Sequence, residues 1–231
     1  YLDATIATMR KFGVTVQTLI PYKRYNITPQ IYKDTSFIVP IDFSSLALLL
    51  SASVLNGVDV KIKGDIGTLP QGDEVFLDIL EQLGVTVTIN DDEIKIKSPE
   101  KLNGGKFDLS NSPDLLPPLA ILSLNTSNPI EITNVKHARL KETDRIAIVS
   151  REMVKLGIKV QEKEDGLILE STENLKAAEL NSENDHRLFM AFCIAGMYVG
   201  DCTVSDPESV NVSYPNFIEE MNNLGARIKV Q

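Results

Sequence analysis

Two acidic side chains, Asp114 and Glu142, stand close to cations in a sequence that is acidic overall. The chain has 23 Lys and Arg against 32 Asp and Glu, a net charge of −9. Lys141 and Arg145 flank Glu142, and Arg187 follows another expected helix start. Two carboxylates in different surroundings can divide the roles of acid and base, and clustered cations bind phosphate or carboxylate. These residues predict acid and base catalysis on an anionic substrate.

A plainer interpretation covers part of this pattern. Glu142 could be only an ion-pair partner of Lys141 or Arg145, and a charge run can be a solvated surface. Aspartate at a helix start accepts hydrogen bonds from free backbone N–H groups and suits the helix dipole. Capping explains three of the acids well: Asp42, Asp73 and Asp144. It does not explain the cations, because positive charge at a helix N-terminus opposes the dipole. More of them lie nearby: Lys136, His137 and Arg139.

Composition and motifs argue against several other classes of protein. The chain has 231 residues, 43% hydrophobic, which suffices for one large or two small domains with a core. Its acidity disfavours nucleic-acid binding, and no apolar run of about 18 residues suggests a membrane span. Zinc spacing, a Gly-rich phosphate loop and a nucleophile elbow are absent. We expect no metal, cofactor, nucleic acid or membrane partner, and two free thiols in a reducing cytoplasm.

The elements that must position these residues repeat along the chain. A Leu-Gly or Phe-Gly step closes an amphipathic helix and opens an alternating strand at four glycines: Gly13, Gly84, Gly157 and Gly225. Their separations are 71 (13 to 84), 73 (84 to 157) and 68 (157 to 225) positions. Glycine just past a helix supplies a left-handed residue that other side chains resist. We predict an α/β domain at 36–231 of three β-α-β-α-β-β units, about 36–103, 104–172 and 173–231, preceded by the tail of an earlier unit at 1–35.

In the first full unit we expect a strand at 37–40, a helix at 43–55, a strand at 58–63 and a helix at 73–83. Two strands at 85–89 and 93–97 follow, joined by a hairpin turn at 91–92. The second unit has helices starting near Asp114 and Thr143 and a hairpin turn at 164–166, and the third stops inside its last strands. The first helix of each unit begins with an aspartate: Asp42, Asp114 and Asp185. Free N–H groups at such helix starts favour anions, so the cations beside them strengthen the prediction of an anion site.

Five motifs in collinear order resemble the 5-enolpyruvylshikimate-3-phosphate synthase family. They are RLKETDR at 139–145, SPD at 112–114, NDHRLFMA at 184–191, DP at 206–207 with SYPNF at 213–217, and YLDAT at 1–5 with FG at 12–13. They are distributed over nearly the whole chain. The resemblance implies an enolpyruvyl transferase-like domain, an inverse α/β barrel, whose helix N-termini face a cleft shared with an N-terminal domain. Residues 1–35 would belong to that other domain.

The reaction implied by the resemblance is a step of the shikimate pathway. Enolpyruvyl passes from phosphoenolpyruvate to the 5-hydroxyl of shikimate 3-phosphate, and phosphate leaves. Asp114 matches the acid/base aspartate near that hydroxyl, and Glu142 matches the carboxylate that handles the proton at the enol carbon. Lys141 matches a lysine shared between the substrates. Arg145 and Arg187 match arginines that hold phosphoenolpyruvate, a role that suits the forked guanidinium.

Two further residues match the substrate surroundings: Tyr1, near the shikimate phosphate, and His186, beside the phosphoenolpyruvate site. The chain also departs from the family pattern. His137 stands where many members have an asparagine that contacts the shikimate ring, and Val212 stands where some have a lysine. Two prolines, at 117 and 118, fall early in the helix of the acid/base aspartate. Because each proline disfavours helical geometry in the residue before it, the local placement of that aspartate stays open.

The family's N-terminal Lys-Ser pair, Asn-Ala-Gly-Thr loop and Ser-Ser-Gln phosphate site have no counterpart in this sequence, which begins at Tyr1 without methionine. Half a cleft lacks the opposing groups that position substrates. We therefore expect the chain alone to fold but to be inactive, with the missing N-terminal half as its partner. Two alternatives stay open: the related transferase that acts on UDP-N-acetylglucosamine, which lacks the KETDR run, and a non-catalytic ligand-binding module of the same fold.

Overall fold

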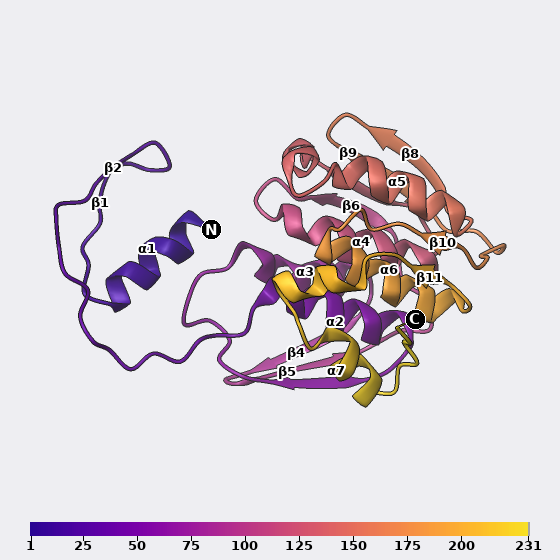
Figure 1. Cartoon of the computed structure of the whole chain (residues 1–231), viewed down its shortest axis with the longest axis horizontal. Helices are drawn as coiled ribbons and strands as arrows, with labels where there is room; N and C mark the ends of the chain where they lie inside the picture. The colour runs from indigo at the N-terminus through magenta and orange to yellow at the C-terminus, as the bar shows by residue number, and fades with distance from the viewer. Residues whose placement is uncertain (231) are drawn as a thin grey trace.

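The N-terminal segment stands apart from the main body. A computed structural model describes residues 1–230. The segment contains helix α1 (Leu2–Lys11) and a hairpin of β1 (Gln17–Ile20) and β2 (Arg24–Asn26). Figure 1 shows it to one side of the other elements, with the N-terminus directed towards them. No residue from 17 to 42 is buried. The prediction of a strand at 37–40 is wrong, because this stretch forms no ladder.

The two larger sheets of the main body share a three-strand pattern. In the first unit the strands are β3 (Val60–Lys63), β4 (Thr86–Asn90) and β5 (Glu93–Lys97), in the order β3-β5-β4. In the second they are β6 (Gly105–Asp108), β7 (Ile130–Thr133), β8 (Lys159–Lys163) and β9 (Gly166–Glu170), in the order β6-β7-β9-β8. β6 and β7 run parallel and the other neighbours antiparallel. The second sheet therefore repeats the first with one parallel strand added at its edge.

The third unit is shorter than predicted within the described residues. Its strands β10 (Glu179–Leu180) and β11 (Thr203–Val204) form a parallel pair like β6 and β7. The residues from 224 to 230, where we expected the start of its last strands, form none. Both predicted hairpin turns are confirmed, because β4 and β5 flank residues 91–92 and β8 and β9 flank residues 164–165.

The first helices of the three units form the centre of the molecule. They are α2 (Phe43–Leu55), α4 (Leu116–Leu122) and α6 (His186–Val199), and each contacts the other two. α4 is buried on every side, and 11 of the 13 residues of α2 are buried, as expected for helices that are apolar all round. Figure 1 shows these helices between the sheet of β4 and β5 and that of β8 and β9. The helices thus lie inside and the sheets outside, and the predicted α/β fold of repeated units is confirmed.

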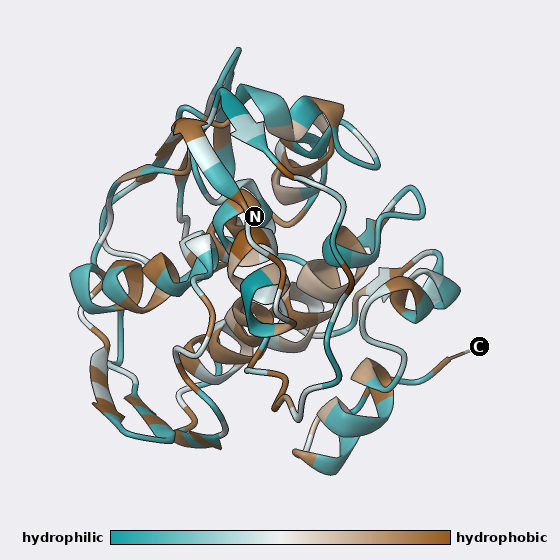
Figure 2. Cartoon of the chain, turned by 90° about the vertical axis from the view of Figure 1, so that its left-hand side faces the viewer, coloured by the Kyte–Doolittle hydropathy of each residue, from teal (hydrophilic) through white to brown (hydrophobic). Residues whose placement is uncertain are grey.

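The second helices cover this centre and end as the glycine pattern predicts. They are α3 (Val75–Gln82), α5 (Arg145–Lys155) and α7 (Phe217–Asn223). The buried residues of α3 and α5 occupy one face, an amphipathic pattern that Figure 2 shows as alternating brown and teal on the outer helices. The four repeat glycines all have positive φ, between 80° and 105°. Among residues 1–230, no helix combines the length and apolarity that crossing a membrane requires.

Candidate functional site

Arg145 is the centre of an ion-pair network at the start of α5. Its side chain has no exposed surface. Its Nε donates to Asp185 Oδ2, its Nη1 to Asp114 Oδ1 and its Nη2 to Glu142 Oε2, each over 2.7 Å. Burial by itself lowers the pKa of Arg145, but these carboxylates raise it above its usual value. One guanidinium therefore joins the starts of α5 and α6 to the turn that precedes α4.

Local sequence explains why these side chains are aimed at one point. Asp185 is the N-cap of α6, and its Oδ1 accepts from the backbone N–H groups of Arg187 and Leu188. Arg145 donates to both of its oxygens, through Nε to Oδ2 and through Nη2 to Oδ1. Asp144 caps α5 and Asp42 caps α2, so the capping prediction is confirmed for both. It is wrong for Asp73, whose side chain accepts from the Ser44 hydroxyl and caps no helix.

Asp114 lies in a 3-10 turn, η2 (Pro113–Leu115), and not in the first turn of the α-helix. The helix α4 begins at Leu116, with the two prolines at 117 and 118 in its first turn. Prolines are tolerated there because the first N–H groups of a helix have no partner within it. The turn places Asp114 beside Arg145 with its side chain only 9% exposed.

Four groups surround the Asp114 carboxylate. The Tyr1 hydroxyl donates to Oδ2 over 2.6 Å, and Lys141 Nζ lies 3.2 Å from Oδ1. Arg145 also binds Oδ1, and Arg187 Nη2 lies 3.5 Å from Oδ2. Burial by itself raises the pKa of Asp114, but Arg187, the Tyr1 hydroxyl, Arg145 and Lys141 together lower it to about 2. Asp114 is therefore ionised at neutral pH and shielded by positive charge.

Among the described residues, Lys141 and Arg187 have donors without a partner in the chain. Lys141 Nζ pairs with Asp114 and lies 5.5 Å from the centroid of the Tyr1 ring. Within residues 1–230, the Arg187 guanidinium has one ion pair, the 3.5 Å contact with Asp114, and no shorter one. These two cations can accept an anion without breaking the network. Arg145 has less to offer an anion, because four of its five N–H donors already bind carboxylates.

The structure thus brings together five of the predicted side chains, as we expected: Asp114, Glu142, Lys141, Arg145 and Arg187. Tyr1 joins them from the far end of the chain. Glu142 is 47% exposed on its side chain, so a ligand could reach it. His186 is buried beside Arg187, and burial first and Arg187 second lower its pKa. The roles of these residues towards substrate remain predictions.

The other predicted cations serve different partners. Lys136 pairs with Glu164, and Arg139 binds both Asp144 and Glu162. Both belong to the 3-10 turn η4 (Lys136–Leu140), which precedes the start of α5. His137 is exposed in the same turn, and no hydrogen bond or ion pair within residues 1–230 joins it to the network. Arg139 stabilises the cap of α5, so the run of cations contributes to structure as well as to charge.

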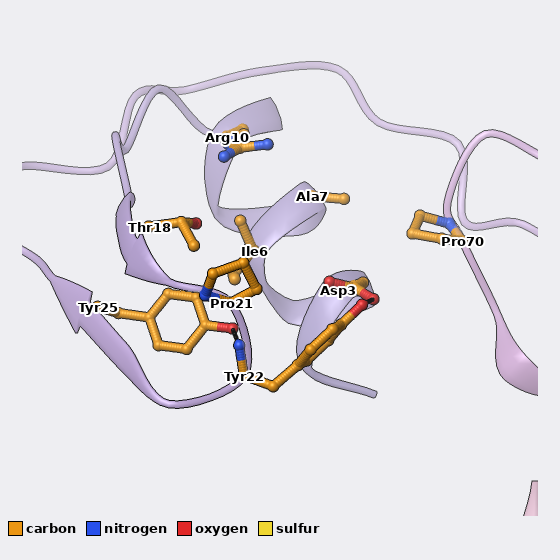
Figure 3. Close-up of a pocket in the computed structure, with 9 residues that line it drawn as sticks. All are labelled: Asp3, Ile6, Ala7, Arg10, Thr18, Pro21, Tyr22, Tyr25 and Pro70. Carbon is orange, nitrogen blue, oxygen red and sulfur yellow. Dashed lines mark hydrogen bonds between the residues drawn. The ribbon is translucent and has the colours of Figure 1, made fainter. Parts of the chain in front are cut away.

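A separate hollow of about 270 Å³ lies under α1 and the β1–β2 hairpin, with one wall from the main body. Figure 3 shows Tyr22 and Asp3 facing each other at its side, where the Tyr22 hydroxyl donates to Asp3 Oδ2 over 3.1 Å. None of the network residues lines it. The lining residues are Asp3, Ile6, Ala7, Arg10, Thr18, Pro21, Tyr22, Tyr25 and Pro70.

Sequence reasoning missed the part that two aspartates take in the site. We identified Asp185 only as a helix start, although it directly precedes His186 and Arg187. We interpreted Asp73 as a cap because Gln71-Gly72-Asp73 stands at the repeat position of Glu142-Thr143-Asp144, 71 residues earlier. No signal in the sequence distinguished Asp73 from the cap Asp144. No group of three or more His, Cys, Asp or Glu that could hold a metal ion occurs among the described residues.

Comparison with known proteins gives consistent matches along almost the whole chain. The sequence model of EPSP synthase (3-phosphoshikimate 1-carboxyvinyltransferase) matches residues 1–221. A 3-phosphoshikimate 1-carboxyvinyltransferase of Nitrosopumilus maritimus is 82% identical over 99% of this chain, and one of Methanococcus maripaludis is 38% identical over all of it. The chain spans about half the length of these curated relatives, 54% in each case.

Solved structures agree with the sequence matches. An EPSP synthase from Acinetobacter baumannii superposes with a TM-score of 0.83 and 27% identity, covering 97% of this chain and 55% of that one. The enolpyruvyl transferase NikO from Streptomyces tendae superposes with a TM-score of 0.75 over 95% of this chain and 52% of that one. At 20% identity, this second likeness supports the fold alone.

Proposed function

The chain belongs to the EPSP synthase family, and from that premise we propose that it forms the C-terminal half of the catalytic cleft of a 3-phosphoshikimate 1-carboxyvinyltransferase. The reaction would transfer enolpyruvyl from phosphoenolpyruvate to the 5-hydroxyl of shikimate 3-phosphate and release phosphate. The observation that carries the proposal is the network itself, in which Asp114 and Glu142 share one buried guanidinium and Lys141 and Arg187 both pair with Asp114.

Asp114 would act as the base at the hydroxyl. A carboxylate with a pKa of about 2 is a weak base, so the substrates must raise it. Lys141 and Arg187 hold part of the positive charge that lowers it, and both have donors free for phosphate or carboxylate oxygens. When an anionic substrate takes up these donors, less positive charge acts on Asp114 and its proton affinity rises. Binding of the substrate would thus prepare the base.

Glu142 would supply the proton to the enol carbon. It differs from Asp114 in exposure, since nearly half of its side chain is open and one oxygen is held by Arg145. Two carboxyl groups in such different surroundings can take opposite roles. Arg145 would orient both of them, because its guanidinium binds one oxygen of each at 2.7 Å. For Arg145 to hold phosphoenolpyruvate as well, it would use its one remaining N–H on Nη1 or exchange a carboxylate for the substrate.

The partner would be the N-terminal half of the same enzyme, which would close the cleft opposite the network and supply the remaining substrate contacts. The half-length match to the relatives supports this proposal. Two free cysteines, Cys193 and Cys202, suit a reducing compartment such as the cytoplasm.

A complementation assay tests the proposal. The 231-residue chain is mixed with the separately produced N-terminal half of the Nitrosopumilus maritimus enzyme, and phosphate release from phosphoenolpyruvate is followed with shikimate 3-phosphate present. We expect turnover only from the mixture. Asp114→Asn and Glu142→Gln should each lower kcat/KM by about 10²-fold or more, whereas Glu170→Gln, an exposed carboxylate paired with Lys159, should leave it unchanged.

Three outcomes would contradict the proposal. Turnover by the chain alone would show that the opposite half of the cleft is not needed. Turnover with UDP-N-acetylglucosamine in place of shikimate 3-phosphate would assign the other transferase activity. Binding of phosphoenolpyruvate by a mixture that forms but releases no phosphate would indicate a non-catalytic module.

A further inference from the structure

Asp73 is a buried carboxyl group that neither capping nor the ion-pair network explains. It lies in the 3-10 turn η1 (Gly72–Glu74) ahead of α3 and is only 3% exposed. Its Oδ2 contacts the Ser44 hydroxyl, whereas its Oδ1 is buried with no hydrogen-bond partner among the described residues. An ionised oxygen left in this state would cost several kcal/mol. The fold tolerates Asp73 there only if something lowers that cost.

The turn that contains Asp73 is hydrogen-bonded to the segment that leads into the turn of Asp114. The Ser112 hydroxyl donates to the backbone carbonyl of Gly72 over 2.7 Å. The approach is so close that a Cβ at Gly72 would lie 2.9 Å from the backbone oxygen of Asn111. Asp73 directly follows Gly72, and Asp114 lies two residues after Ser112. The two aspartates therefore sit in neighbouring turns, held by a contact that leaves no room for a larger residue.

The charges that face Asp73 come from several elements. Burial raises its pKa most, and the negative charges of Asp114 on η2 and Asp42 at the cap of α2 raise it further. The Ser44 hydroxyl and the Arg187 guanidinium on α6 act in the opposite direction, but the pKa remains above its usual value. The charge of Asp73 also acts on the Tyr1 hydroxyl, which donates to Asp114. Asp73 thus belongs to the same electrostatic environment as the network.

We propose that Asp73 holds a proton while Asp114 is ionised, so that the two aspartates form a coupled pair of one neutral and one charged carboxyl group. In the ionised form the Ser44 hydroxyl donates to Oδ2; in the protonated form the proton lies on Oδ2 and this contact reverses, so that Oδ2 donates to the hydroxyl. The oxygen without a partner is then a neutral carbonyl, for which burial costs much less than for a charged oxygen. Two carboxyl groups that share an environment often divide their charge in this way.

Asp73 would then be a positioning residue for Asp114. If Asp73 ionised, its charge would draw Arg187 away from Asp114 and from any anion bound there. By remaining neutral, it leaves Arg187 directed at Asp114 and free for phosphate or carboxylate. The protonation state can be measured on the chain alone, and only its use in catalysis rests on the proposed function. Failure of the complementation assay therefore leaves this inference standing, and the reverse also holds.

Carbon-13 NMR of the aspartate carboxyl groups tests the proposal in the 231-residue chain. Asp73 should titrate above the ordinary aspartate range of about 3.9, while Asp114 stays ionised down to a pH of about 2. Asp114→Asn removes a facing negative charge and should lower the midpoint of Asp73. Arg187→Gln removes a facing positive charge and should raise it. Asp78→Asn, an exposed change on α3, is the matched control and should leave the midpoint in place.

A midpoint for Asp73 at or below the ordinary range in the unmodified chain would overturn the proposal, whatever the variants do. An Asp73 midpoint that is raised but that neither variant changes would also overturn the proposal, because burial alone would then explain the shift. The two variants change the charge in opposite directions, so a general loosening of the fold cannot reproduce both results. If Asp114→Asn does not fold, the measurements on the unmodified chain and on Arg187→Gln still decide the matter.

Discussion

At the scale of single residues, the site depends on one buried arginine more than on the residues that would contact substrate. Arg145 binds Asp114 through Nη1, Glu142 through Nη2, and Asp185 through both Nε and Nη2. A buried charge network of this kind is costly to assemble and is strongly destabilised when one member is lost. The guanidinium fork suits three partners, which lysine could not bind in the same geometry. Arg145 therefore fixes the positions of the carboxylates whatever it contacts during catalysis.

Replacing Arg145 by methionine tests this role. The change leaves three carboxylates without their shared cation, and we expect the free energy of unfolding to fall by about 3–5 kcal/mol. Urea denaturation followed by circular dichroism measures it. Arg151→Met is the matched control, because Arg151 also lies on α5 and pairs with a buried carboxylate, Glu152, yet its own side chain is 48% exposed. The control variant should lower the free energy of unfolding by about 1 kcal/mol or less. An equal loss in both variants would contradict the central role of Arg145.

The low pKa of Asp114 predicts how its contribution to stability changes with pH. The pKa of about 2 in the folded chain lies below the unfolded value of about 3.9. The group therefore stabilises the fold above pH 4, and this stabilisation, about 2 kcal/mol, is lost as the pH falls from about 4 to about 2. The stability difference between the unmodified chain and Asp114→Asn should shrink over this range in urea titrations. A difference that stays constant down to pH 2 would contradict the depressed pKa.

At the scale of elements, the helix ends that repeat every 70 or so residues are built by glycines with positive φ. They differ in the space around them. At Gly157 (φ 97°) an added Cβ would lie 2.5 Å from the backbone oxygen of Asn174, whereas at Gly225 (φ 105°) nothing lies within 4 Å. The first glycine is required by both backbone conformation and packing, and the second by conformation alone.

Alanine substitutions separate these two requirements. Gly225→Ala should lower the free energy of unfolding by about 1–2 kcal/mol, since alanine resists the left-handed conformation. Gly157→Ala should cost more, because the backbone of residue 174 must also move. Urea midpoints of the two variants, measured side by side, give the comparison. Equal losses would mean that the stretch around Asn174 yields freely, which would contradict a packed junction between the second and third units.

At the scale of the whole molecule, the core belongs to the main body and the N-terminal segment is attached at few points. Most residues of the central helices α2, α4 and α6 are buried, whereas no residue from 17 to 42 is buried. The Tyr1 hydroxyl on Asp114 is the contact that brings the segment to the site. This arrangement fits the proposal that residues 1–35 belong to another domain.

Removing residues 1–35 tests that proposal. We expect the chain 36–231 to unfold cooperatively in urea with a loss of about 1–3 kcal/mol, the range for a hydrogen bond to a charged group. Tyr1→Phe in the full chain should reproduce most of this loss, because it removes the same hydroxyl and keeps the segment. A shortened chain that fails to fold would show that the segment is part of the core.

The local patterns of the sequence determined the repeat, the helix-ending glycines, the hairpin turns and the caps at Asp42 and Asp144, because each depends on residues only a few positions apart. The tertiary structure decided the rest. The partners of Arg145 lie 31 and 40 positions away at Asp114 and Asp185, and no local spacing specifies which carboxylate a cation will meet. Residues 37–40 have the pattern of a strand but pair with no other strand among the described residues, and a strand is stabilised by backbone hydrogen bonds to a neighbour. Asp73 resembles a cap in sequence, but its surroundings, assembled from α2, η2 and α6, made it a buried carboxyl group of the site.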